Sequence, residues 1–334
     1  MVSAVTKNNH SLDVAGLGGV IVVLAGGTAA EREISLASGK AIYSALLKQN
    51  IEVELIDMVD GFVQRLLEIK PVFAFIAVHG RGGEDGVLQA TLESLQIPYS
   101  GSPVLGSALA MDKIRSKCVW QSAGVATAEF RYLGLGQREV QDAALNCDEI
   151  ADALGERLFV KPANEGSSFG MSFVKSSEQL AAAIETAREF DSSVLIEQFI
   201  DGPEYTLPIL MGYDLPAIRI ETQREFYDYQ AKYQDDDTGF FLPSGLSLAE
   251  ELELRELCVK AFRVLGCKGW GRVDVMRDGH SGEFKILEVN TVPGMTDHSL
   301  VPKSAAAVGM SFEDLVAAIV NVALIERYDA ISQD

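Results

Sequence analysis

The sequence predicts a mixed fold, in which an α/β unit built on a parallel sheet is followed by α+β units. Three observations support this prediction. The N-terminal part alternates short apolar runs with a helix pattern, as βαβ units do. The middle of the chain places strand patterns on both sides of a helix pattern, and the C-terminal part adds longer strand patterns between helices. A chain of 334 residues has room for two or three such units, each with its own core.

The elements of the N-terminal unit follow from the period of their apolar residues. A fully apolar run predicts a buried strand, and apolar residues on one face predict an amphipathic helix. The predicted elements are strands at residues 20–24, 53–56 and 72–78 and a helix at 33–49, whose apolar face would comprise Ile34, Ala37, Ala41 and Ala45.

The later elements are predicted in the same way. A helix that leads away from the N-terminal unit is expected to begin around residues 111–120. The other predicted elements are strands at 158–161, 171–175 and 194–197 and helices at 177–190, 249–265 and 311–328.

Composition and charge exclude several classes of protein. The formal net charge of -20 opposes binding to a nucleic-acid backbone, because nothing supplies clustered Lys and Arg. The four cysteines form no C-x-x-C pair, which favours ordinary buried thiols in a reducing compartment. No run of 18 apolar residues is present, so a membrane-spanning helix is not expected. Within the apolar segment 15–27, residues 20–24 are interpreted as a strand rather than as part of a signal peptide. Asp13 precedes the segment, and Lys7 is the only lysine or arginine upstream of it.

Two neighbouring strand patterns in the C-terminal part carry polar residues at alternating positions. Alternation places the polar side chains of each strand on one face, so four polar groups would converge if the strands pair. Two carboxylates and an amide oxygen suit Mg²⁺, and a guanidinium suits an anion beside the metal, which together indicate phosphoryl transfer. The four residues are Arg272 and Asp274 from segment 269–276, and Glu288 and Asn290 from segment 284–294.

Three glycine-rich segments follow predicted strands. Neither a dinucleotide fingerprint after a strand nor a G-x-x-x-x-G-K-[ST] loop is present. Segment 161–170 begins with Lys161 and could cover phosphates with backbone N–H groups, although a plain β-turn is the favoured interpretation of this segment taken alone. Segment 26–33 opens a helix and would favour an anion, or would simply complement the helix charge. In segment 79–86, four glycines follow His79, which points to a constrained loop at a sheet edge.

Taken together, these segments resemble the D-alanine–D-alanine ligases, a family of the ATP-grasp superfamily. The resemblance extends in order from about Val20 to about Tyr328. It rests on GGTAAERE at 26–33, HGRGGEDG at 79–86, MDK at 111–113, EGSS at 165–168, FYDYQAKY at 226–233 and EVNTVPGMT at 288–296.

This resemblance implies a three-domain ATP-grasp architecture with an N-terminal parallel-sheet, Rossmann-like domain. The expected domains are a mobile N-terminal extension at 1–17, a substrate-binding domain at 18–112, a central domain at 113–197, and a catalytic domain at 198–334 with a lid loop at 227–245.

The resemblance also implies an enzyme that joins two D-alanine molecules through a D-alanyl phosphate, for peptidoglycan synthesis. Glu31, Ser167 and Tyr233 would form a hydrogen-bonded trio over the reactants, and Arg272 would stabilise the oxyanion. The substrate-binding residues implied are Glu31, His79, Gly294, Ser299 and Leu300.

ATP and two Mg²⁺ ions, with Mn²⁺ as an alternative metal, are the cofactors that the resemblance implies. The implied metal ligands are Asp274, Glu288 and Asn290. The implied ATP-binding residues are Lys113, Lys161 and Lys232 at the phosphates, Glu197, Gln198, Phe199 and Ile200 at the adenine, Glu204 at the ribose, and Tyr227 at the start of the lid. Outside the family pattern, Glu197 and Glu204 would be interpreted as solvated surface charges.

Other interpretations remain open at this stage. A different ATP-grasp amino-acid or peptide ligase would share the metal ligands, and a non-catalytic ATP-binding regulator is the other alternative. The intact Lys232-Tyr233 pair favours an amine nucleophile. Gln230 and Phe169 depart from the family pattern and affect the expected lid kinetics and ATP affinity. The family suggests a cytoplasmic homodimer that binds ATP and D-alanine but neither nucleic acid nor membrane.

Overall fold

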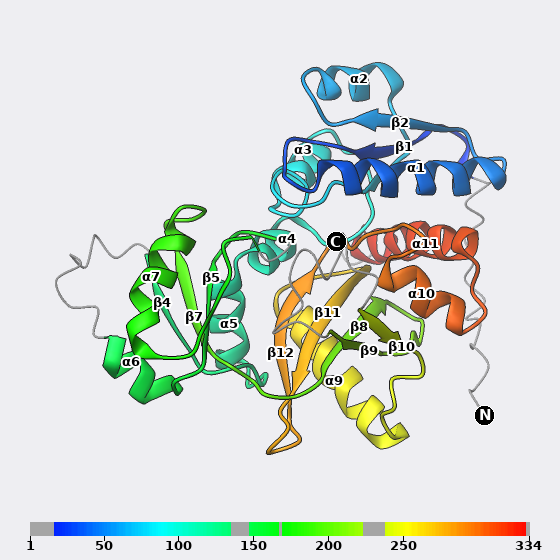
Figure 1. Cartoon of the computed structure of the whole chain (residues 1–334). Helices are drawn as coiled ribbons and strands as arrows, with labels where there is room; N and C mark the ends of the chain where they lie inside the picture. The colour runs from blue at the N-terminus through cyan, green and yellow to red at the C-terminus, as the bar shows by residue number, and fades with distance from the viewer. Residues whose placement is uncertain (1–16, 135–146, 167–168, 223–237, 332–334) are drawn as a thin grey trace.

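The computed structural model describes residues 17–134, 147–166, 169–222 and 238–331. The described residues form three sheets, one of three strands, one of four and one of five (Figure 1). The predicted extension is therefore almost entirely outside the described residues, as are Ser167, Tyr227, Gln230, Lys232 and Tyr233.

The N-terminal sheet has the parallel arrangement that the sequence predicts. Its strands are β1 (Ile21–Ala25), β2 (Val53–Asp57) and β3 (Phe73–Ile76), and β1 pairs in parallel with both neighbours in the order β2-β1-β3. All five residues of β1 are buried, as expected of a central strand covered on both faces. The helices of this unit are α1 (Arg32–Lys48), α2 (Phe62–Ile69), α3 (Val87–Ser94) and α4 (Val104–Met111).

The face by which α1 packs differs from the prediction. Ala37 is exposed, and Ile34 and Ala41 are only partly buried. The buried face instead comprises Ser35, Ser38, Gly39, Ile42, Ala45 and Leu46. Small residues occupy the buried face because the helix lies very close to the sheet. A Cβ on Gly39 would be 2.4 Å from Cβ of Ala25. The buried serines are hydrogen-bonded; Ser35 Oγ, for example, donates to the carbonyl of Ala77 at 2.7 Å.

The chain turns sharply between the first and second units. The predicted helix around residues 111–120 is in fact two helices, α4 and α5 (Lys113–Ser122), separated by Asp112 in an extended conformation. The Asp112 carboxylate caps α5 by accepting a hydrogen bond from the backbone N–H of Arg115 at 2.9 Å. This cap explains the Met111-Asp112-Lys113 motif structurally and places Lys113 at the first residue of the helix.

The central sheet is antiparallel. Its strands are β4 (Phe130–Leu133), β5 (Leu158–Pro162), β6 (Ser172–Val174) and β7 (Val194–Gln198), in the order β4-β7-β5-β6. The helices α6 (Cys147–Leu154) and α7 (Ser177–Arg188) accompany it. Leu154, Leu180, Ile184 and residues of the strands form a core within this unit.

The C-terminal sheet is also antiparallel, in the order β10-β9-β8-β11-β12. Its strands are β8 (Glu204–Leu210), β9 (Ile218–Glu221), β10 (Gly239–Phe241), β11 (Trp270–Arg277) and β12 (Phe284–Asn290). The helix α9 (Leu248–Val264) begins at a capping box formed by Ser247 and Glu250, and α10 (Leu300–Ala307) and α11 (Phe312–Ile331) complete the chain.

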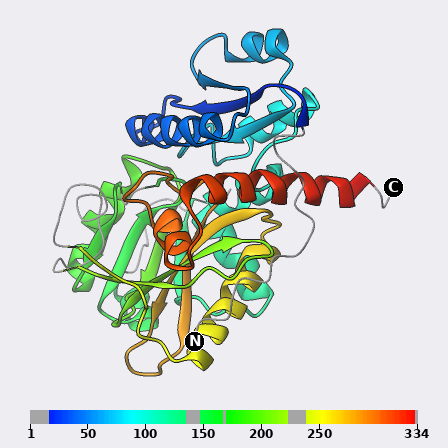
Figure 2. The same ribbon diagram turned by 90° about the vertical axis from the view of Figure 1, so that its right-hand side faces the viewer.

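The last helix joins the two ends of the sequence. Figure 2 shows α11 running beneath the N-terminal unit, and its residues share one hydrophobic cluster with β1, β3, α1 and Trp270. The Lys48 ammonium also lies 2.8 Å from the Glu313 carboxylate. The N-terminal and C-terminal sheets therefore belong to one packed body, and the predicted domain boundaries stay predictions. Among the described helices, none alone is long and apolar enough to span a membrane. Only α10 and α11, which are bent relative to each other, reach that length and hydropathy when taken together.

We expect Gly39→Ala to destabilise the fold, although alanine is the better helix former by roughly 1 kcal/mol. The added Cβ would overlap Ala25 in a fully packed layer, and overpacking costs about 1–3 kcal/mol. Urea unfolding should therefore show a net loss of stability of up to about 2 kcal/mol. Ser44→Ala, at an exposed position of the same helix, is the control and should leave the unfolding free energy unchanged or slightly higher.

Candidate active site

The pairing of β11 with β12 brings together the four polar residues predicted from the alternation pattern. Arg272 lies opposite Asn290, and Asp274 lies opposite Glu288, so all four side chains share one face. A register irregularity follows directly after Asp274. The predicted convergence is confirmed, and it depends on this single register.

Arg272 and Asp274 form a bidentate ion pair on this face. Nε and Nη2 of Arg272 donate to the two carboxylate oxygens of Asp274 at 2.8 and 2.7 Å. Thr206, on the neighbouring strand β8, donates its hydroxyl to Asp274 Oδ1 at 2.6 Å. Asp274 is only 5% exposed, so its charge is held by these three hydrogen bonds rather than by bulk water.

The second carboxylate is partnered by a lysine from another unit. Lys113 Nζ lies 3.3 Å from Glu288 Oε2 and donates to the backbone carbonyl of Glu165 at 2.8 Å. Lys113 thus connects β12 to the hairpin that follows β5. Arg81, from the N-terminal unit, reaches the same hairpin through an ion pair with Glu165 at 2.9 Å.

The donor set on this face suits a hard divalent cation that shares its shell with a ligand. Within the described ranges, no three His, Cys, Asp or Glu side chains lie close enough to form a complete metal site. Two carboxylates and one amide are nevertheless what Mg²⁺ takes from a protein when phosphate oxygens supply the remaining positions. The side chains that would contribute are those of Asp274, Glu288 and Asn290.

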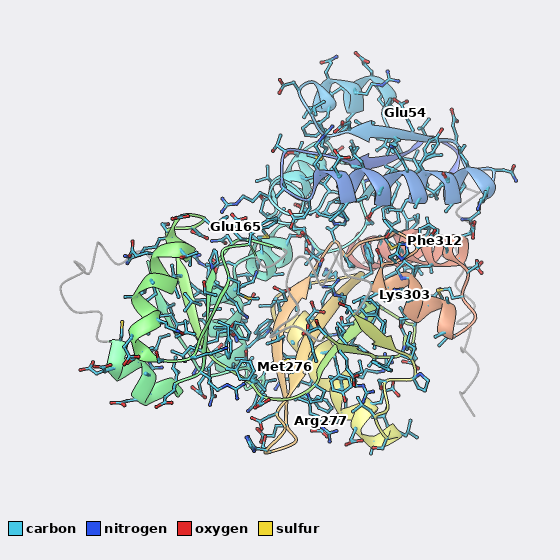
Figure 3. All side chains as sticks on the ribbon, viewed as in Figure 1. Glu54, Glu165, Met276, Arg277, Lys303 and Phe312 are labelled. Carbon is cyan, nitrogen blue, oxygen red and sulfur yellow. The ribbon has the colours of Figure 1, made fainter. Side chains whose placement is uncertain are left out.

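A cavity of about 460 Å³ lies between the central and C-terminal sheets, next to these residues. Figure 3 labels two residues of its lining, Glu165 from the hairpin and Met276 from β11. Its walls carry Lys113 and Lys161 beside Asp274 and Glu288, and also the apolar side chains of Phe159, Met171, Phe199, Ile200, Met276 and Leu287. A cavity with charged groups and apolar walls fits a ligand that has an anionic end and a flat apolar end.

Glu197 is the most deeply buried charged residue in the lining of this cavity. Its carboxylate forms ion pairs with Lys117 and with Lys161, the latter at 2.6 Å, and Glu197 is 2% exposed. Burial alone would raise the pKa of Glu197, but the two lysine charges overcome it and lower the pKa to about 2. The interpretation of Glu197 as a solvated surface charge is therefore wrong. Lys117 also donates to Thr127 Oγ1 at 2.5 Å, which fixes its position.

The segment after Glu197 forms one apolar wall. The backbone N–H of Gln198 donates to the carbonyl of Glu129, and that of Phe199 donates to the carbonyl of Arg157, both at 2.9 Å. The Arg157 guanidinium stacks over the Phe199 ring at 4.0 Å. Gln198, Phe199, Ile200 and Glu204 all line the cavity.

The glycine-rich loops enclose the carboxylate of Glu31. A Cβ on Gly80 would lie 2.6 Å from Glu31 Oε2, and a Cβ on Gly166 would lie 2.6 Å from Glu31 Oε1. Gly80 also has a φ of +70°, which favours glycine. A side chain at either position would therefore displace the Glu31 carboxylate, and Glu31 is only 8% exposed.

His79 and Glu84 belong to the same glycine-rich loop as Gly80. Burial lowers the pKa of His79 to about 4, and the positive charge of Arg272 adds to the effect. Burial raises the pKa of Glu84 to about 7, and repulsion from Glu31 and Glu288 adds to it. Both side chains contact the backbone of Val292, in the loop between β12 and α10.

The loop after β12 also positions the last predicted residues. Ser299 Oγ accepts a hydrogen bond from the backbone N–H of Thr296 at 2.9 Å, and a Cβ on Gly294 would lie 2.8 Å from that oxygen. Ser299 is the N-cap residue of α10, and Leu300 is the first residue of that helix. The structure therefore brings Gly294, Ser299 and Leu300 together at a helix N-terminus, which favours an anion.

Sequence reasoning missed four residues of this region, namely Ser38, Glu84, Lys117 and Thr206. The alternation of β8 would have placed Thr206 on the face of Glu204, but nothing in the sequence ties either to Asp274. Lys117, with a side chain 1% exposed, gives no signal at all because its partner Glu197 is 80 positions away along the chain.

Comparison with known proteins agrees with this geometry. Residues 119–321 match the family model described as the D-Ala-D-Ala ligase C-terminus. A D-alanine–D-alanine ligase of Ectopseudomonas mendocina is 52% identical over 301 residues, which is 90% of this chain and 93% of that protein. One from Pseudomonas putida is 48% identical over 327 residues, covering 98% of this chain and all of that protein.

Solved structures extend the likeness to the whole fold. The D-alanine–D-alanine ligase of Bacillus anthracis in complex with ATP superposes with a TM-score of 0.79 at 34% identity, covering 93% of this chain and 99% of that one. The VanG D-Ala:D-Ser ligase of Enterococcus faecalis superposes with a TM-score of 0.78 at 29% identity, covering 91% and 99%. The three-sheet arrangement is therefore the ATP-grasp architecture of these ligases, and the chain belongs to the D-alanine–D-alanine ligase family.

Proposed function

We propose that this protein joins two D-alanine molecules to D-alanyl-D-alanine at the expense of ATP, releasing ADP and phosphate, in the supply of peptidoglycan precursors. The observation that carries the proposal is the shared face of Arg272, Asp274, Glu288 and Asn290, which borders the lysine-containing cavity. This layout provides both a site for phosphoryl transfer and a cation for the acyl centre beside it.

ATP would occupy the cavity between the central and C-terminal sheets. Phe199, Ile200 and Met276 provide apolar walls for the base, and Glu204 lies in reach of a ribose. Lys113 and Lys161 would receive the phosphates, and their present partners Glu288 and Glu197 keep both side chains in the cavity. Glu197 stays ionised because of its two lysines, so it would orient Lys161 at any ordinary pH.

Magnesium ions, or manganese ions in their place, would be held by Asp274, Glu288 and Asn290. They would neutralise the charge on the transferring phosphoryl group. Arg272 and Lys113 now hold these carboxylates in place by ion pairs, so the oxygens are already aimed at the shared face.

The chemistry has two steps. A carboxylate oxygen of the first D-alanine attacks the γ-phosphorus of ATP, and ADP leaves. The neutral amine of the second D-alanine then attacks the acyl carbon and loses a proton, and the tetrahedral intermediate expels phosphate, which can carry that proton away. Glu31 would hold the first ammonium group, and Arg272 with the N–H of Gly294 would stabilise the oxyanion. Ser299 and the N–H of Leu300 would bind the second carboxylate.

Several expectations extend beyond the described residues. Ser167 and Tyr233 would complete the trio with Glu31, Lys232 would meet the γ-phosphate, and Tyr227 would begin the lid. The approach of Gly166 to Glu31 supports the proposal that this loop takes part in the trio. We also propose a cytoplasmic homodimer, as the family suggests.

An alternative activity would differ in the second substrate, which is the nucleophile. The structural likeness to a D-Ala:D-Ser ligase favours D-serine as an alternative nucleophile. A different amino-acid or peptide ligase, and a non-catalytic ATP-binding regulator, are the remaining alternatives.

Phosphate release from ATP and Mg²⁺ should depend on D-alanine. We expect phosphate release with D-alanine alone and none with L-alanine. Adding D-serine to D-alanine should give the mixed dipeptide more slowly, and adding D-lactate should give no D-alanyl-D-lactate. Chromatography of the dipeptide identifies the product. Turnover with L-amino acids but not with D-alanine would contradict the proposed function, and binding of ATP without any turnover would support the regulator.

Arg272→Ala should lower kcat by roughly a hundred- to a thousand-fold, the usual effect of removing one oxyanion donor. ATP affinity, measured by isothermal titration calorimetry, should survive because Arg272 is not part of the cavity lining. Arg277→Ala is the matched control, since Arg277 lies on the same strand but pairs with Glu250. Equal activity of the Arg272 and Arg277 variants would remove the oxyanion role.

Lys117→Met should destabilise the protein and weaken ATP binding together. Removing one partner of a buried ion pair costs about 3–5 kcal/mol, and Glu197 would be left with Lys161 alone. Urea unfolding and ATP titration measure the two effects. Lys260→Met, at an exposed lysine that donates to the carbonyl of Gly124, should change neither by a measurable amount. A Lys117 variant as stable as the wild type would show that the ion pair contributes nothing.

A further inference from the structure

The loop between β12 and α10 is fastened to the N-terminal unit by side chains that the proposed mechanism does not use. This loop carries Gly294, whose N–H is the proposed oxyanion donor. On either side of Gly294, Val292 and Met295 are buried at 3% and 1% exposure. Val292 packs into a cluster of the N-terminal unit, and Met295 packs into the cluster that the N-terminal unit shares with α10 and α11.

The first fastening is a relay through Ser38 and His79. Ser38, fully buried on α1, accepts a hydrogen bond from the backbone N–H of Met295 at 3.1 Å. Its Oγ also lies 3.2 Å from His79 Nε2, and His79 Nδ1 lies 2.7 Å from the carbonyl oxygen of Val292. The relay therefore reaches the loop at two points, one before and one after Gly294.

The proton positions of this relay follow from its two ends. A carbonyl oxygen can only accept, so the proton of the imidazole is on Nδ1 and Nε2 is an acceptor. The Ser38 hydroxyl then donates to Nε2 while its oxygen accepts from Met295. The low pKa of His79 keeps the ring neutral at ordinary pH, so every member of the relay is satisfied.

The second fastening is the carboxylate of Glu84. Its Oε2 accepts from the N–H of Gly80 at 2.6 Å, and its Oε1 accepts from the N–H of Val292 at 3.2 Å. Glu84 and His79 together hold both the N–H and the C=O of Val292. The peptide that leads to Gly294 is thus fixed in orientation from the N-terminal side.

We propose that Ser38, His79 and Glu84 are positioning residues that aim the Gly294 N–H at the acyl centre. This inference rests on the proposed function. The N–H must point to where the oxyanion develops, and a misplacement of about 1 Å can cost on the order of a hundred-fold in rate. Small residues on the α1 face serve this purpose, since a larger side chain at position 38 would separate the helix from the loop.

This assignment changes the role expected for His79. The family resemblance implies that His79 contacts the first substrate. Both ring nitrogens, however, are engaged by Ser38 and Val292, and the ring is 7% exposed. His79 therefore acts through the loop rather than on the substrate.

The test compares Ser38→Ala, His79→Asn and the double variant with the wild type, using intact protein, D-alanine, ATP and Mg²⁺. We expect kcat to fall roughly 10- to 100-fold in each single variant, with ATP affinity unchanged within twofold. The double variant should be within threefold of the slower single variant, because both changes interrupt one relay. Ser107→Ala is the control; this buried serine donates to the carbonyl of Ser102 and should keep wild-type kcat.

Hydrogen exchange gives a readout that does not need turnover. The amides of residues 292–296 should exchange faster in Ser38→Ala than in the wild type or in Ser107→Ala. If the wild type fails to use D-alanine but this difference persists, the proposed function fails and the fastening of the loop stands. If Ser38→Ala fails to fold, Glu84→Gln takes its place, since an amide offers only one acceptor oxygen for two N–H groups.

Three outcomes would overturn the proposal. They are a kcat within threefold of the wild type in Ser38→Ala or its replacement, a loss of ATP affinity as large as the loss of kcat, and effects of Ser38→Ala and His79→Asn that multiply in the double variant.

Discussion

The antiparallel register of β11 on β12 is the constraint on which the rest of this site depends. It sets Arg272 opposite Asn290 and Asp274 opposite Glu288. A slip by one residue would turn these side chains to the other face of the sheet, where the core residues Val273 and Val289 now lie. Because that face is packed by α9, hydrophobic burial holds the register, and the register in turn holds the polar site.

Three acidic side chains of the site are stabilised by ion pairs with cations. Asp274 forms an ion pair with Arg272, Glu288 forms one with Lys113, and Glu197 forms ion pairs with two lysines. These partners come from α5, β5 and β11, so the charged groups also connect the central and C-terminal units across the cavity. A protein with a net charge of -20 thereby presents cations where an anionic ligand would bind.

The two ends of the chain are rigidly joined, whereas the central sheet has a core of its own. The cluster that contains α11 and β1 makes the N-terminal loops and the β12–α10 loop parts of one body. Groups that act on the acyl centre, such as Glu31, Arg272 and Gly294, are therefore fixed relative to one another. The central sheet carries the hairpin and one wall of the cavity. The ion pair Arg81–Glu165 and hydrogen bonds between residues 126–127 and Ile286 connect its unit to that body.

The sequence by itself determined the βαβ start, the strand patterns with their alternating polar residues, and, through its motifs, the family. These features are local, since period and turn chemistry act over a few residues. Only the tertiary structure decided which face of α1 is buried, how Asp112 divides two helices, and that Glu197 lies between Lys117 and Lys161. It alone also showed that His79 is held by Ser38 and Val292. Such partners lie tens to hundreds of residues apart, and packing rather than local pattern brings them within hydrogen-bonding distance.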